Sequence, residues 1–261
     1  RDALRRRAAR EHERRQVPLR HDPHQRAEPL VRRIPRDRDL DRAAHREIGR
    51  AERMAECGGM ARHRLGDRLQ QVSRTLGEYT DRQRIPQLRE VNQKLSASPT
   101  GFQMVPVAGL VTSRAFLGNL RFDQFLSTQY IRHHTVPLYT PEPDIVHELV
   151  GHAATLADPG FAELNRAFGR AAERVSEDVL KQIERVYWYT LEFGVAKEGE
   201  ELKAYGAGLL SSFGELERFR SHAKLVPLDI DAMTARPYDP TVYQEVLYVA
   251  PSFQDAVRTV T

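Results

Sequence analysis

All the aromatic residues of this 261-residue chain lie beyond residue 78. The first is Tyr79, so the N-terminal quarter contains no Phe, Tyr or Trp. Because buried aromatic side chains supply much of the apolar area of a protein core, residues 1–64 are not expected to form a core by themselves. The folded part of the chain is therefore predicted to begin near Leu65, as a single domain over residues 65–261.

Residues 1–64 also carry the positive charge of the chain. They contain 19 Arg, no Lys and 11 acidic residues, which leaves 21 basic and 25 acidic residues in the remainder. High charge without aromatic residues is typical of disorder, whereas Arg clusters can also bind nucleic acid. A third interpretation is out-of-frame translation of a GC-rich gene, which can produce an Arg-rich sequence without Lys. We predict a disordered or non-native extension rather than a nucleic-acid-binding arm.

The rest of the composition argues against a membrane-spanning protein and against a fold stabilised by disulfides. No run of about 18 apolar residues occurs, so a membrane span is not expected. The only cysteine, Cys57, cannot form an internal disulfide and fits a reducing compartment. We therefore expect a soluble, cytoplasmic protein.

The spacing of apolar residues beyond residue 64 predicts mostly helices, because many recur at intervals of three to four. Capping residues, prolines and glycines set the expected boundaries. We expect helices over residues 65–78, 86–95, 160–173 and 176–195, short helices after Thr112 or Ser113 and from Pro251, strands over 102–107 and 242–249, and chain breaks at Gly206, Gly208 and Gly214. The predicted fold class is mostly α with small β elements.

Two histidines lie on a helix that Asp144 is expected to cap. The segment His147-Glu148-Leu-Val-Gly151-His152 resembles the zinc-protease pattern, but its histidines are five residues apart instead of four. On a regular helix this spacing separates them by about 140°. Both can reach one metal ion only if the helix is distorted, for example by a π-bulge, and Gly151 makes such a distortion less costly.

Two imidazoles and one carboxylate form the facial triad of non-haem Fe(II) oxygenases. Glu192 is favoured as the carboxylate because it follows Tyr187 and Trp188 in an aromatic stretch, where a buried charge needs a partner. Spacing alone leaves other carboxylates open, namely Asp158, Glu163, Glu173, Glu177, Asp178 and Glu184. Two other interpretations are ordinary helix histidines with a solvent-facing Glu192, and a zinc hydrolase with Glu148 as base, for which the spacing is wrong.

Five segments of the chain resemble the pterin-dependent aromatic amino acid hydroxylases. They occur in order between about residue 83 and the end, and they are Pro106–Leu110, Thr128–His133, Tyr139–His152, Tyr187–Gly194 and Ala204–Glu215. The resemblance implies a mostly helical catalytic domain that binds Fe(II) through His147, His152 and Glu192. It also implies tetrahydrobiopterin or a related tetrahydropterin as reductant, O2 as co-substrate, and hydroxylation of the ring of a free aromatic amino acid.

The resemblance further assigns residues to the two small molecules. The expected pterin residues are Gly109, Val111, Phe116, Glu148 and Tyr187, with Phe116 as a stacking surface. Arg132 is expected to bind the carboxylate of the amino acid, since a guanidinium can bind it in a bidentate manner. The remaining substrate residues are Thr140, Gly208 and Ser211 along the amino acid backbone, and Pro143, Trp188 and Phe193 around its ring.

The resemblance favours phenylalanine, converted to tyrosine, as the reaction. Trp188 is similar to the phenylalanine and tyrosine enzymes, and Pro240 stands where tyrosine hydroxylases have an aspartate, although the neighbouring Asp239 leaves that alignment open. Leu126 replaces a polar residue of animal members, so meta-hydroxylation of phenylalanine stays an alternative, as do tyrosine and tryptophan. Nothing in residues 1–82 resembles the family's regulatory domain, and a monomer or weak dimer is expected.

Overall fold

The computed structural model describes residues 85–133 and 142–261. The predicted helix over 65–78 and the extension over 1–64 lie outside these residues. In the first described part, the predicted helix over 86–95 is confirmed as α5 (Leu88–Leu95), which buries Val91 and Leu95. The predicted strand is β1 (Gln103–Pro106). The predicted cap is Thr112, whose hydroxyl accepts a hydrogen bond from Ala115 at the start of α6 (Ser113–Leu120).

A small parallel pair of strands forms around α6. Strand β2 (Gln124–Ser127) was not predicted, and it pairs with β1 so that Met104 lies opposite Phe125. Both side chains are buried, together with Leu117 and Leu120 from α6. Four strand residues are too few to show a clear alternation of apolar and polar positions, and β2 lacks the preceding Pro and Gly that marked the equally short β1.

The histidine segment is a π-helix, η1 (His147–Ala153), which continues into α7 (Ala154–Leu156). Helix α8 (Pro159–Ala171) follows, with the Asp158 carboxylate as its cap. Helix α9 (Glu177–Tyr187) begins after the cap Ser176 and passes directly into a second π-helix, η2 (Trp188–Glu192). The helix predicted over 160–173 is confirmed. The one predicted over 176–195 is confirmed as far as Glu192, but not beyond, because Val195 begins a strand. Both segments that carry the candidate metal ligands depart from regular α geometry.

The second half of the chain adds a four-stranded sheet in the order β4-β3-β6-β5. Its strands are β3 (Val195–Glu198), β4 (Glu201–Ala204), β5 (Lys224–Pro227) and β6 (Val246–Ala250). Strands β3 and β4 form an antiparallel hairpin, and β6 runs parallel to both β3 and β5. The predicted strand over 242–249 thus begins four residues later, because residues 242–245 belong to a loop beside the cavity described below.

The predicted chain breaks at Gly208 and Gly214 are wrong, because both glycines lie inside helices. These are α10 (Ala207–Ser211) and α11 (Phe213–His222), and α12 (Ile230–Ala235) and α13 (Phe253–Val260) complete the fold. A Cβ on Gly208 would lie 2.6 Å from the Phe193 ring, and one on Gly214 would collide with the Tyr243 hydroxyl. These glycines permit close approach of neighbouring side chains instead of turning the chain.

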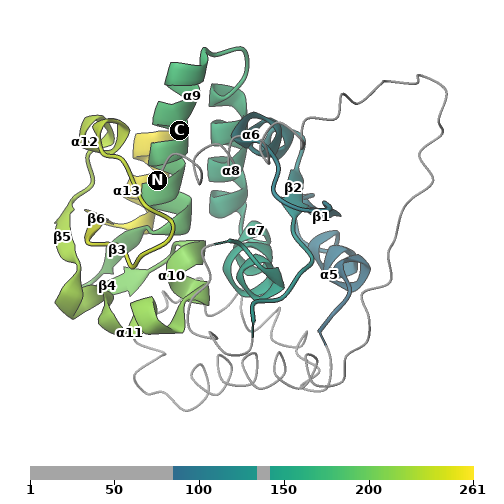
Figure 1. The fold of residues 1–261 in the computed structure, drawn as a ribbon, viewed down its shortest axis with the longest axis horizontal. Helices are drawn as coiled ribbons and strands as arrows, with labels where there is room; N and C mark the ends of the chain where they lie inside the picture. Colours follow the sequence, from purple (N-terminus) through teal and green to yellow (C-terminus); the bar gives the residue numbers. More distant parts are fainter. Residues whose placement is uncertain (1–84, 134–141) are drawn as a thin grey trace, which may run out of the picture. The chain divides into compact units, whose positions relative to one another are not determined.

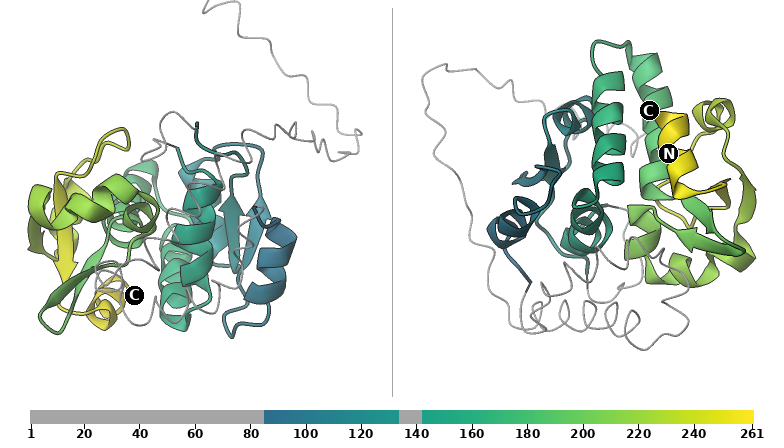
Figure 2. Two further views of the ribbon diagram at one scale, coloured as in Figure 1. Left: turned by 90° about the horizontal axis from the view of Figure 1, so that it is seen from below. Right: turned by 180° about the vertical axis from the view of Figure 1, so that it is seen from behind.

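Helices α8 and α9 lie side by side between the two sheets. The β1–β2 pair, with α5 and α6, is on one side of them, and the four-stranded sheet is on the other (Figures 1 and 2). The main core joins residues from all these parts, including Phe102, Leu156, Leu164 and Tyr248. Among the residues that the structure describes, no helix has the length and apolar character that crossing a bilayer requires.

Candidate active site

The π-helix brings the two histidines together. The Nε2 atoms of His147 and His152 are 2.9 Å apart, although five residues separate them in the sequence. In a π-helix the backbone is bonded between residues five apart, so side chains at this spacing lie above one another. The helix starts where predicted, because the Asp144 carboxylate accepts a hydrogen bond from the His147 backbone N–H at 3.0 Å. The distortion inferred from the sequence is therefore confirmed.

Glu192 reaches both histidines from η2. One carboxylate oxygen lies 3.1 Å from His152 Nε2, and the other lies 3.5 Å from His147 Nε2. Several of the other carboxylates left open by the sequence have different partners. Asp158 caps α8, whereas Glu163, Glu173 and Glu177 form ion pairs with Arg170, Arg121 and Arg114.

These three side chains fit a metal ion by their geometry. Two ligand atoms that each lie about 2.1 Å from one ion, at right angles, are about 3.0 Å apart. The two Nε2 atoms are 2.9 Å apart, and they lie 3.1 and 3.5 Å from different oxygens of Glu192, so each separation is close to the edge of an octahedral face. Such a face leaves the opposite coordination positions to other ligands, as in the non-haem iron oxygenases.

Glu148 is a competing carboxylate, since its oxygen, His147 and His152 have ligand atoms within 4.8 Å of one another. One of its oxygens, however, accepts hydrogen bonds from both the backbone N–H and the hydroxyl of Thr128, each at 2.9 Å. Burial raises the pKa of Glu148 to about 7. A carboxylate that is held in this way and that favours its neutral form is a poorer ligand than Glu192, which faces both histidines.

The charge states of the three groups suit a cation. Burial lowers the pKa of His147 to about 4, so its imidazole is neutral at physiological pH. Burial alone would raise the pKa of Glu192, but the two histidines outweigh it and lower the pKa, so the carboxylate is ionised. Burial opposes protonation of His152, but Glu192 and Glu148 outweigh it and raise that pKa. A metal ion therefore competes with a proton for His152, and the competition becomes stronger as pH falls.

Ser211 sets the tautomer of His147. The Ser211 hydroxyl donates to the Ala207 carbonyl at 2.8 Å, and its oxygen lies 2.9 Å from His147 Nδ1. Because the hydroxyl proton is used on Ala207, Ser211 accepts the Nδ1 proton, and the lone pair of Nε2 then faces His152 and Glu192. Ser211 was predicted to contact the amino acid, and this support of His147 was not foreseen.

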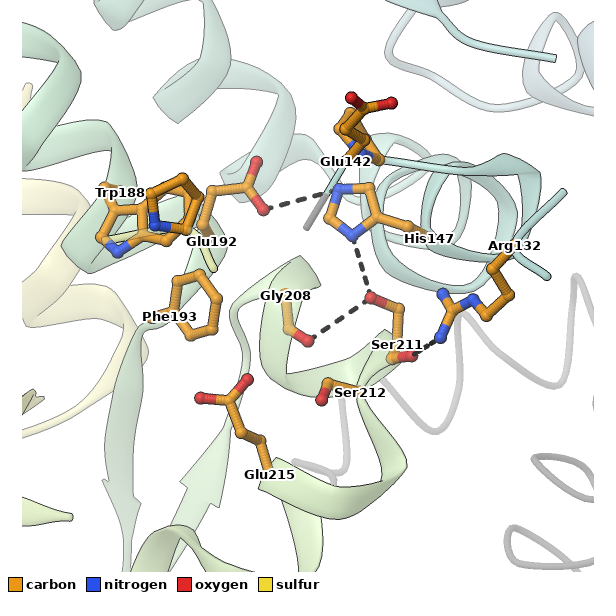
Figure 3. A pocket seen from close by; sticks show the side chains of 12 residues that line it. Arg132, Glu142, His147, Trp188, Glu192, Phe193, Gly208, Ser211, Ser212 and Glu215 are labelled. Carbon is orange, nitrogen blue, oxygen red and sulfur yellow. Dashed lines mark hydrogen bonds and ion pairs between the residues drawn. The ribbon is translucent and has the colours of Figure 1, made fainter. Parts of the chain in front are cut away.

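A cavity of about 130 Å³ opens beside His147 and Glu192 (Figure 3). It is lined by six of the seven predicted substrate residues: Arg132, Pro143, Trp188, Phe193, Gly208 and Ser211. The seventh, Thr140, lies outside the described residues. Four further lining residues are Glu142, Ser212, Glu215 and Pro240. Ser212 and Glu215 belong to the fifth segment that carries the family resemblance, which was the signal available for finding them.

The guanidinium of Arg132 is held in place by Asp144. Its Nε and Nη2 atoms donate to the two carboxylate oxygens of Asp144, both at 2.8 Å, and Nη1 donates to the Ser211 carbonyl at 3.3 Å. Burial alone would raise the pKa of Asp144, but Arg132 outweighs it and lowers the pKa. The pair is almost fully buried, so a guanidinium of fixed orientation, with Asp144 as its counter-ion, borders the cavity. The sequence had assigned Asp144 a capping role only.

Aromatic rings form one wall of the cavity. Trp188 stacks on Tyr238 with ring centres 4.1 Å apart and an angle of 11°, and it contacts Phe193 at 4.6 Å. Figure 3 shows Trp188 and Phe193 beside Glu192, across the cavity from Arg132. Tyr238 was not predicted, because it lies in a loop about fifty residues from Trp188 and no periodicity links the two.

The predicted pterin residues lie on another side of the histidines. Phe116 meets Tyr187 edge to face with ring centres 5.6 Å apart, and Glu148 lies close enough to raise the Tyr187 pKa further, beyond the effect of burial. Gly109 and Val111 are exposed in the loop between β1 and α6. None of these five residues lines the cavity beside His147 and Glu192, so their roles stay predictions.

Replacing Gly151 by Ala is expected to destabilise the site. A Cβ at Gly151 would lie 2.8 Å from both the Cβ and the carbonyl oxygen of Ala207, so η1 and α10 would have to separate. We expect a loss of about 1–3 kcal/mol in the free energy of unfolding, measured in urea. Gly118→Ala in α6 is the matched control, because its Cβ meets no atom within 4 Å and should be neutral or stabilising.

Glu215 is expected to make stability depend on pH. Burial raises its pKa from 4.5 to about 7, although Gln244 and Ser212 donate hydrogen bonds to it. The stability contributed by the neutral carboxyl is thus fully present below about pH 4.5 and is lost as pH rises through 7. Glu215→Gln cannot ionise and should exceed the parent by about 2 kcal/mol at pH 8 but not at pH 5. Parallel urea-unfolding profiles of the two proteins would contradict this assignment.

Comparison with known proteins identifies the family of the chain. Residues 60–261 match the family model of the biopterin-dependent aromatic amino acid hydroxylases. Phenylalanine-4-hydroxylase of Bos taurus is 49% identical over 177 residues, which are 67% of this chain and 39% of that protein. Tyrosine 3-monooxygenase of Drosophila melanogaster is 48% identical over 178 residues, 66% of this chain and 30% of that protein. The match thus spans well under half of the length of these relatives.

Solved structures agree in fold. Phenylalanine hydroxylase from Legionella pneumophila aligns with a TM-score of 0.76 and 30% identity, covering 85% of each chain. Phenylalanine hydroxylase from Chromobacterium violaceum, solved with bound iron(III) and oxidised 7,8-dihydrobiopterin, gives a TM-score of 0.74 and 27% identity, covering 92% of this chain and 85% of that one. With a family model that matches most of its length and a facial set of two histidines and a glutamate, this chain belongs to the biopterin-dependent aromatic amino acid hydroxylases.

Proposed function

We propose that this chain hydroxylates free phenylalanine to tyrosine with Fe(II), a tetrahydropterin and O2. The observation that supports the proposal is that the side chains of His147, His152 and Glu192 converge within 3.5 Å of one another, and that His147 and Glu192 border a cavity with a buried guanidinium and an aromatic wall. When bound, iron and the tetrahydropterin supply the activation of dioxygen that ring hydroxylation requires. The protein supplies the ligands, the orientation of the amino acid and the exclusion of water.

The amino acid would be oriented by its two ends. Arg132, fixed by Asp144, offers the positive charge that a free carboxylate needs. Trp188 and Phe193 offer flat apolar surfaces to the ring, beside the carboxylate of Glu192. Binding at both ends holds the ring next to the ligand set, which reduces the entropic cost of reaction.

The loop 237–243 favours phenylalanine over tyrosine. Pro240 lines the cavity, whereas the Asp239 carboxylate accepts hydrogen bonds from the backbone and the hydroxyl of Thr241 at 2.8 and 2.6 Å. An apolar residue at the position facing the ring leaves the hydroxyl of tyrosine without a partner, which disfavours tyrosine as substrate. Meta-hydroxylation of phenylalanine, or use of tryptophan, are the alternatives that the assay must separate.

The test is product analysis by mass spectrometry. Purified protein is supplied with Fe(II), tetrahydrobiopterin and oxygen, with phenylalanine, tyrosine or tryptophan in separate reactions. We expect tyrosine from phenylalanine, identified by its retention time against para- and meta-tyrosine. Hydroxylation of tyrosine or tryptophan at a higher rate would overturn the substrate, and no product from any of them, with iron bound, would overturn the activity.

We also propose that residues 1–64 take no part in the reaction, and that the protein is a monomer or weak dimer. A protein that begins at residue 65 should keep the rate of tyrosine formation. A loss of that rate, with the shortened protein still folded by circular dichroism, would show that the extension contributes to the active site.

A further inference from the structure

The indole of Trp188 is held from behind by Gln244. Its Nε1–H donates to Gln244 Oε1 at 2.9 Å. A tryptophan N–H inside an aromatic cluster needs an acceptor, because an unpaired donor there loses its hydrogen bond to water. Gln244 does not itself line the cavity beside His147, so any effect on the amino acid must pass through Trp188 or the adjoining loop.

The Gln244 side chain has only one orientation that satisfies its neighbours. Its Nε2 donates to the carbonyls of Asp239 at 3.1 Å and Val242 at 3.0 Å, while its Oε1 accepts from Trp188. Exchanging the amide oxygen and nitrogen would set a donor against the indole N–H and an acceptor against two carbonyls. The amide therefore joins the indole to the loop 237–243 in a fixed relation.

That loop contributes two residues to the cavity region. Tyr238 stacks on the indole of Trp188, and Pro240 lines the cavity. Hydrogen bonds also hold both ends of the loop. The Tyr189 hydroxyl donates to the Pro237 carbonyl at 3.0 Å, and the Gln244 backbone N–H donates to the Glu215 carboxylate at 2.7 Å. With the ends held, the Gln244 amide acts together with the Tyr238 stack to hold the middle of the loop against the indole.

We propose that Gln244 is a positioning residue that sets the plane of Trp188 and thereby the ring selectivity of the enzyme. Without the amide, the indole can tilt and the loop can move Pro240 away from it. The part of the cavity between Trp188 and Pro240, which would hold the ring of the substrate, then widens. A wider cavity binds phenylalanine less well and discriminates less against the larger ring of tryptophan. The selectivity part rests on the proposed function, but the positioning of Trp188 does not.

The first experiment uses the fluorescence of Trp188, which is the only tryptophan of the chain. Gln244→Leu removes the acceptor and both donors at similar size. We expect a shifted emission maximum, lower anisotropy and stronger acrylamide quenching than in the parent. Gln182→Leu makes the same chemical change at an exposed position of α9 and should leave all three unchanged. Unchanged fluorescence in folded Gln244→Leu would overturn the proposal.

The second experiment measures kinetics. Loss of one hydrogen bond at the indole should raise KM for phenylalanine roughly fivefold, with a smaller change in kcat. The ratio of kcat/KM for phenylalanine to that for tryptophan should fall. In a Trp188→Phe background, Gln244→Leu should change this ratio much less, because the indole through which it acts is gone. An equal change in both backgrounds would overturn the role of Trp188.

The two proposals fail in different ways. If the parent hydroxylates no amino acid but Gln244→Leu still changes the Trp188 emission, the proposed function fails and the positioning role stands. If the parent is active and neither fluorescence nor selectivity responds to the change, the positioning role fails alone. If Gln244→Leu does not fold, Gln244→Glu is used instead. This variant has the same size and keeps an acceptor for the indole, but a carboxylate oxygen replaces the NH2 group that donates to Asp239 and Val242. It is then expected to lower the selectivity ratio, and an unchanged ratio would overturn the proposal.

Discussion

Glu192→Gln is expected to lower iron affinity by at least about 100-fold and to abolish measurable hydroxylation. Glutamine keeps the size of the side chain but loses the negative charge that faces His147 and His152 at 3.5 and 3.1 Å. A neutral amide is a weaker ligand for a hard cation, and the two imidazoles alone leave the charge of the ion uncompensated. The measurement is bound iron per protein after equilibration with a defined concentration of free Fe(II).

Glu200→Gln is the matched control for this change. Glu200 is exposed in the turn between β3 and β4, so its replacement should leave iron binding and activity unchanged. Circular dichroism and the melting temperature of both variants establish that they are folded. Iron binding by folded Glu192→Gln at the affinity of the parent would show that Glu192 is not a ligand, and Glu148 would then be the next carboxylate to replace.

Asp144→Asn is expected to have the second largest effect, on both stability and substrate binding. It removes the charge that pairs with Arg132 through two hydrogen bonds of 2.8 Å, and it leaves a buried guanidinium without its counter-ion. Removing one partner of a buried ion pair costs about 3–5 kcal/mol. Arg132 should also lose its fixed orientation, so KM for phenylalanine should rise by roughly tenfold or more.

The cost of Asp144→Asn is measured by urea unfolding, and the effect on the amino acid by KM at saturating pterin. Asp178→Asn, on the exposed start of α9, is the control and should change neither quantity. An Asp144→Asn protein with parental stability and KM would mean that the Arg132–Asp144 pair neither braces the fold nor orients the guanidinium.

The fold was predictable where apolar periodicity and caps extend over several turns. Helices α8 and α9 were predicted from their spacing, and the structure adds the caps Asp158 and Ser176. Strands of four residues, such as β2, β4 and β5, are too short for alternation to be visible, and β1 was predicted only because an apolar run follows Pro99 and Gly101. The prediction was wrong at Gly208 and Gly214 because the sequence does not distinguish a glycine needed for close packing from a glycine needed for a turn.

The candidate site was also predictable only in part. The spacing of His147 and His152 was enough to require a distorted helix, since no regular helix places both on one face. Residues that act across long separations in sequence were not foreseen, because nothing local connects them. The Asp144 contact with Arg132, the Ser211 contact with His147 and the Gln244 contact with Trp188 are all of this kind.

The most direct test of the claim that this chain hydroxylates phenylalanine with dioxygen is to run the reaction under 18O2 with Fe(II), tetrahydrobiopterin and phenylalanine. The molecular mass of the product is then measured by mass spectrometry. The proposed function predicts tyrosine that carries one oxygen-18 atom, formed by the parent and not by Glu192→Gln. Unlabelled tyrosine would show that the new hydroxyl comes from water and not from dioxygen. No tyrosine at all, from folded protein with iron bound, would equally contradict the assignment of this chain as a phenylalanine hydroxylase.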